Sequence, residues 1–156
     1  ADIFAASYVG STLYRYLDYR TFPIQNSDID CPFHPSNKLR AFVTDSFLSN
    51  QSNYVVDTIQ NALRVICGKQ LLVFNNTIDA SDLYKLLPLE LTTDKDLYSL
   101  FAVAWDIWYG DRSEFKKQNN LVEDLNPSQL YSILNNLVEK SISNYLIQKK
   151  WNNVPK

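Results

Sequence analysis

The stretch TDKDLYSLFAVAWDIWY, residues 93–109, decides the fold class. Thr93 followed three residues later by Asp96 resembles a capping box, a pattern that opens an α-helix. Apolar side chains then fall on every side of the predicted helix, which runs from Asp94 to Tyr109 and is expected to end at Gly110. A helix that is apolar all round belongs in the middle of a domain. The sequence therefore predicts a buried central helix here.

The clearest helix start lies near the C-terminal end of the chain. Asn126 is a good N-cap, Pro127 suits the first helical position, and Gln129 stands at the capping-box position. Apolar residues follow in near-heptad spacing, and Lys149 and Lys150 stand where cations favour the helix dipole. We expect this long helix, from Pro127 to Lys150, to pack beside the central helix.

Three more helices are predicted in the N-terminal half, from apolar residues spaced three and four apart. One runs from Asp2 to Tyr19, one follows the N-cap Ser36, and one ends at Gly68, which fits a left-handed stop. Between the last two, the polar stretch from Ser49 to Asn53 either separates two stacked helices or bends one kinked helix. Between the first two, Thr21 to Pro35 loses the period and reads as a long irregular loop, where a loop-borne function would lie.

Two shorter elements complete the prediction. Gln70 to Phe74 favours a β-strand, although its partner strand is not identifiable, and Asp79 caps a short helix that Pro88 ends. With no internal repeat and no second domain in sight, we expect one all-α, mainly helical domain over residues 1–156. Its predicted architecture is an orthogonal helical bundle of five or six helices with a central apolar helix, and one short β hairpin is the single optional addition.

Composition excludes several classes of function. Fifteen Lys and Arg against 17 Asp and Glu give a net charge of -2, so general nucleic-acid binding is not expected. Only three glycines are present and no glycine-loop motif occurs, so nucleotide sites of that kind are excluded and no cofactor is expected. The longest nearly apolar run, Leu97 to Tyr109, is shorter than the roughly 20 residues of a membrane span.

Candidate chemical sites are few. Asp28, Asp30, Cys31 and His34 are types that ligate metals, but backbone capping in a loop explains them better, so no metal is expected. His34 is the only imidazole base, and without a recognised nucleophile motif we expect no catalytic residue. Asp106, the single acid in the apolar run, is either a pocket carboxylate or, more commonly, an exposed residue near a basic side chain.

The strongest binding signal is a helix that interleaves aromatic residues with arginines. Its candidate site residues are Tyr14, Arg15, Tyr16, Tyr19 and Arg20. Tyr and Arg dominate interface hot spots, whereas the alternative is arginines that lie over half-buried tyrosines. The sequence favours a non-enzymatic protein–protein interaction domain, such as an adaptor, an inhibitor or immunity-type protein, or a subunit of a complex. The alternatives are a self-assembling coat-type subunit and a small hydrolase that uses His34.

The cellular compartment stays open. Cys31 and Cys67 fit one disulfide or two thiols, and the two Asn-X-Ser/Thr matches are expected by accident in so Asn-rich a chain. We expect a soluble protein, with the cytoplasm slightly favoured over secretion. Another protein is the expected partner, and a homo-oligomer is compatible with the same surface.

Overall fold

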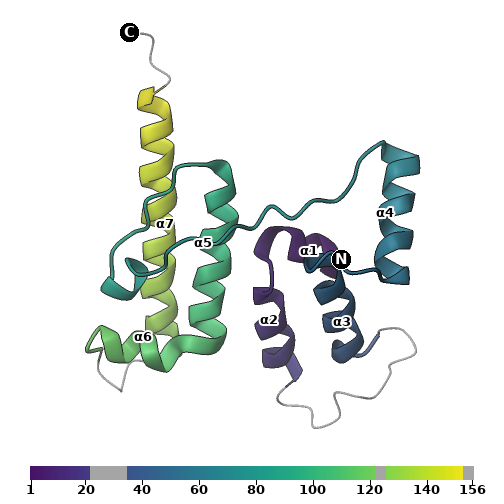
Figure 1. Ribbon diagram of the computed structural model, residues 1–156. Helices are drawn as coiled ribbons and strands as arrows, with labels where there is room; N and C mark the ends of the chain where they lie inside the picture. The colour runs from purple at the N-terminus through teal and green to yellow at the C-terminus, as the bar shows by residue number, and fades with distance from the viewer. Residues whose placement is uncertain (22–34, 122–125, 153–156) are drawn as a thin grey trace. The chain divides into compact units, whose positions relative to one another are not determined.

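The computed structural model describes residues 1–21, 35–121 and 126–152, without the side chains of Tyr14, residues 18–21 and Asp111 (Figure 1). Every regular element in these ranges is helical, so the predicted all-α class is confirmed. The chain divides into two compact units, Ala1–Asn75 and Asn76–Lys156, and each has a hydrophobic cluster of its own. The single domain over residues 1–156 and the orthogonal arrangement stay predictions.

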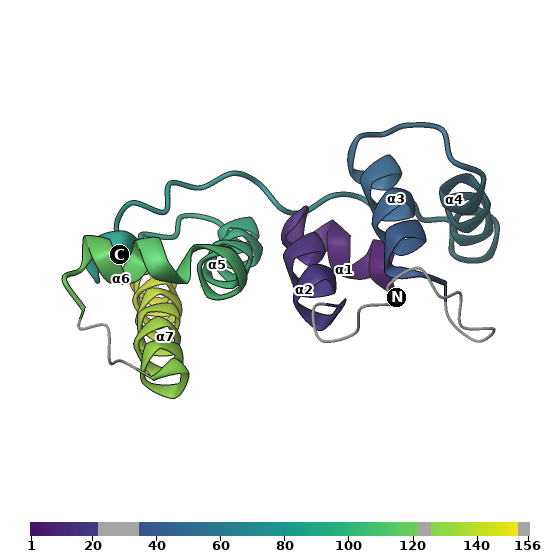
Figure 2. The same cartoon turned by 90° about the horizontal axis from the view of Figure 1, so that it is seen from below.

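The described residues of unit 1, 1–21 and 35–75, form four helices. They are α1 (Asp2–Val9), α2 (Thr12–Thr21), α3 (Asn37–Leu48) and α4 (Tyr54–Cys67). The first three pack against one another, and α4 packs on α3 (Figure 2). The buried apolar cluster consists of Ile3, Ala6, Leu13, Leu17, Phe47 and Val56. Among the helices, α4 has its main contacts with α3, so it lies at the edge of unit 1.

The N-cap of α3 and the end of α4 follow the sequence prediction, whereas the N-cap of α4 lies in the stretch that the sequence marks only as a polar interruption. The Ser36 hydroxyl accepts a hydrogen bond from the Leu39 N–H at 3.2 Å. Asn53 caps α4 by accepting the Val55 N–H at 3.0 Å, and Gly68 ends that helix in the left-handed conformation with φ 63°. Both helices therefore begin and end for local reasons that can be read in the sequence.

The predicted continuous helix from Asp2 to Tyr19 is wrong, because the chain breaks at Gly10 into α1 and α2. Gly10 has φ 61° and ψ -144°, a combination that essentially only glycine adopts. The break allows Leu13 and Leu17 of α2 to enter the same cluster as Ile3 of α1. A regular spacing of apolar residues cannot reveal this change of direction, since both halves keep the helical period.

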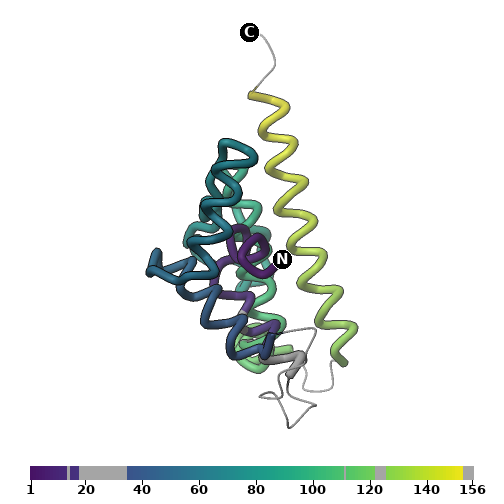
Figure 3. Tube along the Cα trace, turned by 90° about the vertical axis from the view of Figure 1, so that its right-hand side faces the viewer, coloured from purple at the N-terminus to yellow at the C-terminus, as the bar shows by residue number. Residues whose placement is uncertain are grey.

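Unit 2, residues 76–156, is organised by two helices that lie side by side, α5 (Asp94–Asp106) and α7 (Pro127–Asn152) (Figures 1 and 3). Their predicted pairing is confirmed. Asn126 and Gln129 form the predicted reciprocal capping box at the start of α7, with both hydrogen bonds at 3.0 Å. At the other end the Tyr145 hydroxyl donates to the Asp94 carboxylate at 2.7 Å and so ties α7 to α5.

The expected stop at Gly110 does not occur. The chain instead continues through a π-helical turn, η2 (Ile107–Asp111), into α6 (Arg112–Gln118). This continuation brings Phe115 into the core of unit 2, where it is fully buried. The predicted burial of α5 on all sides is also corrected, since Phe101 and Trp105 are 40% and 37% exposed.

The two shorter predictions are corrected as well. Gln70 to Phe74 lies in irregular extended chain, and the described residues contain no β-strand. This chain is held by side-chain and backbone bonds instead, because the Gln60 amide pairs with both the N–H and the C=O of Leu71. The helix expected between Asp79 and Pro88 is a single 3-10 turn, η1 (Leu83–Lys85), after which Leu86 adopts a left-handed conformation.

Candidate protein-binding surfaces

The predicted Tyr/Arg face lies on α2, whose other side packs into unit 1. Leu13 and Leu17 are buried, Tyr16 is half-buried against the cluster, and Arg15 is exposed. The side chains of Tyr14, Tyr19 and Arg20 lie outside the described part. The exposed Arg15 and the partly exposed Tyr16 leave this face as a prediction for the binding experiment.

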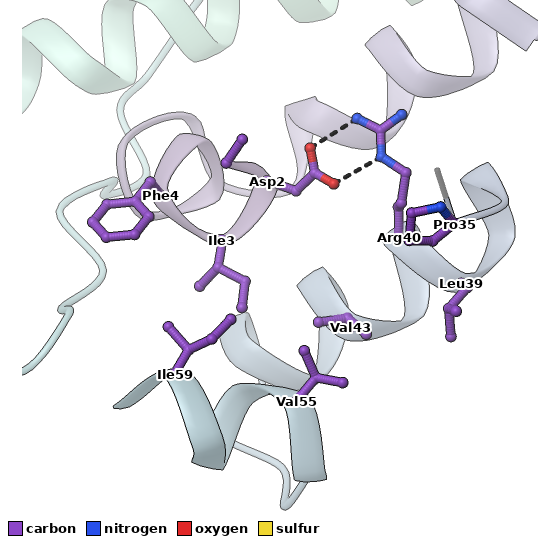
Figure 4. Close-up of a pocket in the computed structure, with 10 residues that line it drawn as sticks. Asp2, Ile3, Phe4, Pro35, Leu39, Arg40, Val43, Val55 and Ile59 are labelled. Carbon is purple, nitrogen blue, oxygen red and sulfur yellow. Dashed lines mark hydrogen bonds and ion pairs between the residues drawn. The ribbon is translucent and has the colours of Figure 1, made fainter. Parts of the chain in front are cut away.

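A groove in unit 1 is lined mostly by apolar side chains from three helices (Figure 4). It has a volume of about 220 Å³ and is half open to solvent. Ile3 and Phe4 come from α1, Leu39 and Val43 from α3, and Val55 and Ile59 from α4. Except for the buried Ile3, these side chains are left partly uncovered. Sequence periodicity places them correctly on apolar sides but cannot show that they surround an opening.

One ion pair closes the polar edge of this groove. The Arg40 guanidinium donates to both carboxylate oxygens of Asp2, from Nε at 2.7 Å and from Nη2 at 2.8 Å, and Nη1 donates to Asn37 at 3.0 Å. The hydrogen bond to Asp2 raises the pKa of Arg40 above its ordinary value, and Tyr16 adds to the shift. A bidentate pair fixes the side chains in place, so this edge joins α1 to α3 and also lies near α2.

Unit 2 carries an aromatic cluster with one arginine around the π-helical turn. The rings of Trp105 and Tyr109 meet edge to face at 5.8 Å, and those of Trp108 and Tyr131 meet in the same way at 5.7 Å. The Arg112 guanidinium lies over the Trp108 ring at 5.1 Å. Sequence reasoning singled out α2 and missed this cluster, although Trp, Tyr and Arg spaced three and four apart were a visible signal.

A larger hollow of about 540 Å³ lies between the α3–α4 connection and the extended chain at residues 70–73. Its lining mixes polar and apolar side chains, among them Gln60, Asp57 and Phe47. The Gln60 side chain is already bonded to the backbone of Leu71. This hollow is therefore chiefly the space under the extended chain that Gln60 holds in place.

The candidate chemical residues are placed as follows. Asp28, Asp30, Cys31 and His34 lie outside the described residues. Asp106 is half-buried near the end of α5 and makes an interaction of its own. Cys67 is exposed with a free thiol at the end of α4.

The described ranges hold neither a metal-binding cluster nor a membrane-spanning helix. Within them, no group of three or more His, Cys, Asp or Glu is arranged to hold a metal ion. No helix in the same ranges combines the length and the apolar character needed to cross a membrane.

Comparison with known proteins gives no further guide. The chain matches no protein-family model, and neither curated proteins nor solved structures give a significant match.

Proposed function

We propose that this protein is a non-enzymatic protein–protein interaction domain, and that the groove of unit 1 receives an apolar segment of another protein. The observation that carries the proposal is the groove itself, which brings apolar side chains of α1, α3 and α4 around one opening. The charged side chains that line it, Asp2 and Arg40, are paired with each other. Its wall therefore favours a partner that contributes apolar surface.

The size of the groove supports a protein partner over a small molecule. Pockets for cofactors and drug-sized ligands usually measure roughly 300–1,000 Å³, whereas this one holds about 220 Å³. That space suits one or two large apolar side chains. Interfaces between proteins commonly concentrate their binding energy in such an anchor and its pocket.

The Tyr/Arg face of α2 extends the proposed surface. Its candidate contact residues are Tyr14, Arg15, Tyr16, Tyr19 and Arg20. Tyr16 lies close enough to Arg40 to influence the pKa of that guanidinium, so α2 adjoins the polar edge of the groove. In the proposal the groove takes the apolar anchor of the partner and the α2 face supplies hydrogen bonds and cation–π contacts around it.

Site-specific crosslinking tests this proposal. A photoreactive residue in place of Leu39, which is half exposed in the groove wall, should crosslink one partner in extracts of the source organism. Val43→Asp should reduce the yield of that crosslink at least tenfold, because a charge would then face the apolar anchor. Lys38→Ala, an exposed change one residue away from the groove wall, is the control and should leave the yield unchanged.

Two results would count against the proposal. Equal crosslinking by the Val43→Asp variant would remove the groove as the binding site. If the double variant Arg15→Ala/Tyr16→Ala gave an unchanged crosslink yield, the α2 face would not be part of the binding surface. The groove would still be the proposed site. Helix content measured by circular dichroism checks that each variant is folded.

A further inference from the structure

The outer side of α4 is the most exposed apolar surface among the helices of unit 1. Tyr54, Val65 and Ile66 are 85%, 83% and 80% exposed, although α4 is strongly amphipathic and buries only Val56 fully. Exposed apolar residues scattered singly need no explanation, but these lie on one short helix. The apolar surface of α4 therefore extends beyond what unit 1 covers.

The exposed residues form one continuous strip along the helix. We call it the α4 stripe, and its members are Tyr54, Val55, Thr58, Ala62, Val65 and Ile66. All six are exposed, and at 3.6 residues per turn they fall on the same side. Asp57 and Arg64 are also exposed, are seven residues apart and lie together along one edge of the stripe.

The α4 stripe has nearly the same order of side-chain sizes when it is read from either end of the helix. Reversal about residue 60 exchanges the members in three pairs: Tyr54 with Ile66, Val55 with Val65, and Thr58 with Ala62. Each large apolar residue is thus exchanged with another large apolar residue, and the two small ones with each other. A two-fold axis at the middle of α4 would produce this exchange between two copies of the helix.

We propose that α4 pairs with α4 of a second copy of this chain, antiparallel and about a two-fold axis near residue 60. The charges agree with this arrangement. In this arrangement Asp57 of one copy lies opposite position 63 of the other. Arg64 of that copy is one residue farther on, an offset of about 1.5 Å along the helix. The two-fold axis repeats this contact, so the dimer contains two ion pairs on the same side of the interface.

Charge complementarity also selects the direction and the occupant. In a parallel pair the two-fold axis would run along the helices and place the edges that carry Asp57 and Arg64 on opposite sides of the interface, so these charges would not meet. Only the antiparallel pair brings Asp57 of one copy near Arg64 of the other. The charges already make local bonds, from the Ser52 hydroxyl to Asp57 and from Arg64 to Asn61, which leave both side chains at the surface. A second copy therefore satisfies the apolar stripe and both charges at once.

The first test is the mass of the full chain in solution. Sedimentation equilibrium between about 1 and 100 μM should give twice the 18.0 kDa of one chain at the upper end of that range. Val65→Asp should shift the chain to monomer over the whole range, and because Val65 is exposed the change should leave helix content intact. A wild-type monomer at 100 μM would overturn the proposal, and so would particles that grow without limit, which would favour a coat-type subunit.

Charge reversal tests the antiparallel register. Asp57→Arg alone and Arg64→Asp alone should each weaken dimerisation about tenfold, since two attractions become two repulsions. An equimolar mixture of the two single variants should recover wild-type dimerisation, because opposite charges then face each other in the mixed dimer. The double variant should recover it as well. Failure of both to recover, with circular dichroism showing that α4 is still helical, would overturn the register.

The dimer and the proposed partner binding can fail separately. Val55 belongs to both surfaces, but Val65 lies outside the groove lining and Val43 lies outside the α4 stripe, so these two positions test the surfaces separately. Val65→Asp should abolish the dimer and retain the Leu39 crosslink, whereas Val43→Asp should do the reverse. If Val43→Asp also made the chain monomeric, the groove and not the stripe would be the self-association surface, and this inference would be wrong.

Discussion

At the scale of a single residue, Asp96 holds the start of α5. Its carboxylate is buried and accepts hydrogen bonds from the N–H and hydroxyl of Thr92, the N–H of Thr93 and the Asn76 amide, at 2.8 to 3.2 Å. Burial raises the pKa of Asp96, but the hydrogen bonds, led by the Thr92 N–H, together outweigh it and hold the pKa well below its ordinary value. We expect Asp96→Asn to lower the free energy of unfolding by about 1–3 kcal/mol at pH 7, measured by urea denaturation.

The pH dependence of this difference checks the cause. A carboxyl whose pKa is lowered by folding contributes its full stability above the unfolded pKa of about 3.9 and loses it as the pH falls toward the folded value. The difference between wild type and Asp96→Asn should stay constant from pH 7 to about 5 and shrink below about pH 4. Asp82→Asn, which removes only an exposed pair with Lys85 at 3.5 Å, should change stability by less than about 0.5 kcal/mol. A difference that persists unchanged at pH 3 would show that the Asp96 charge is not responsible.

Tyr145 is the second residue with a measurable role, because its hydroxyl joins α7 to Asp94 of α5. Tyr145→Phe keeps the buried ring and removes only the hydrogen bond, so it should cost about 1 kcal/mol in thermal or urea unfolding. Lys149 also contacts Asp94 at 2.7 Å, but both side chains are exposed. Lys149→Ala should therefore cost a few tenths of a kcal/mol, and a larger loss from Lys149→Ala than from Tyr145→Phe would contradict this order.

At the scale of the element, two glycines set the limits of helices in unit 1. Gly10 and Gly68 both have positive φ, at 61° and 63°. A Cβ at Gly10 would lie 2.7 Å from the Asn75 side-chain oxygen, whereas a Cβ at Gly68 meets nothing within 4 Å. Gly68→Ala should thus cost about 1 kcal/mol from backbone strain alone, and Gly10→Ala should cost more, roughly 2–3 kcal/mol. Urea denaturation of the two variants compares them directly, and equal losses would mean that neither the Asn75 contact nor the ψ of -144° at Gly10 adds to the cost of a positive φ.

The elements that could be predicted are those with local signals. Ser36, Gly68, the Asn126–Gln129 box and the Thr93–Asp96 box all act within a few residues of their own position, so the sequence alone reveals them. Gly10 and Gly110 show the limit of that reasoning. Gly10 breaks a helix and Gly110 does not, because tertiary packing decides: Leu13 and Leu17 reach the unit 1 cluster only after a break, and Phe115 reaches the unit 2 cluster only if the helix continues.

The candidate surfaces could be predicted only in part. Residue type singled out the Tyr/Arg helix, but the apolar period of α3 and α4 gave no sign of whether a given side would be covered. Leu39 and Val55 read as ordinary core positions in the sequence, yet they are 48% and 44% exposed in the structure. Whether a neighbouring helix covers an apolar side chain depends on contacts between elements. A single sequence does not show these contacts.

At the scale of the whole molecule, the two units differ in how much apolar surface they bury. Among the described residues, the cluster of unit 2 has twelve buried members and that of unit 1 has six, so we expect unit 2 to be the more stable of the two. The chain offers a natural probe of this difference. Its three tryptophans, Trp105, Trp108 and Trp151, all lie in unit 2.

Tryptophan fluorescence therefore reports the unfolding of unit 2, while circular dichroism at 222 nm reports the helices of both units. If the units unfold separately, the helix signal should be lost in two steps, and the first should come at a lower temperature than the fluorescence change, because unit 1 melts first. Separation by more than about 5 °C is expected, since a difference of 1 kcal/mol moves the midpoint of a domain of this size by roughly 4–8 °C. Coincident transitions would instead mean that the chain unfolds as one cooperative body, as a single domain over residues 1–156 requires. Repeating the scan with Val65→Asp separates the stability that unit 1 has by itself from the stability that the α4 dimer adds. If the dimer stabilises unit 1, the first transition should move to lower temperature in the variant. It should also lose its dependence on protein concentration.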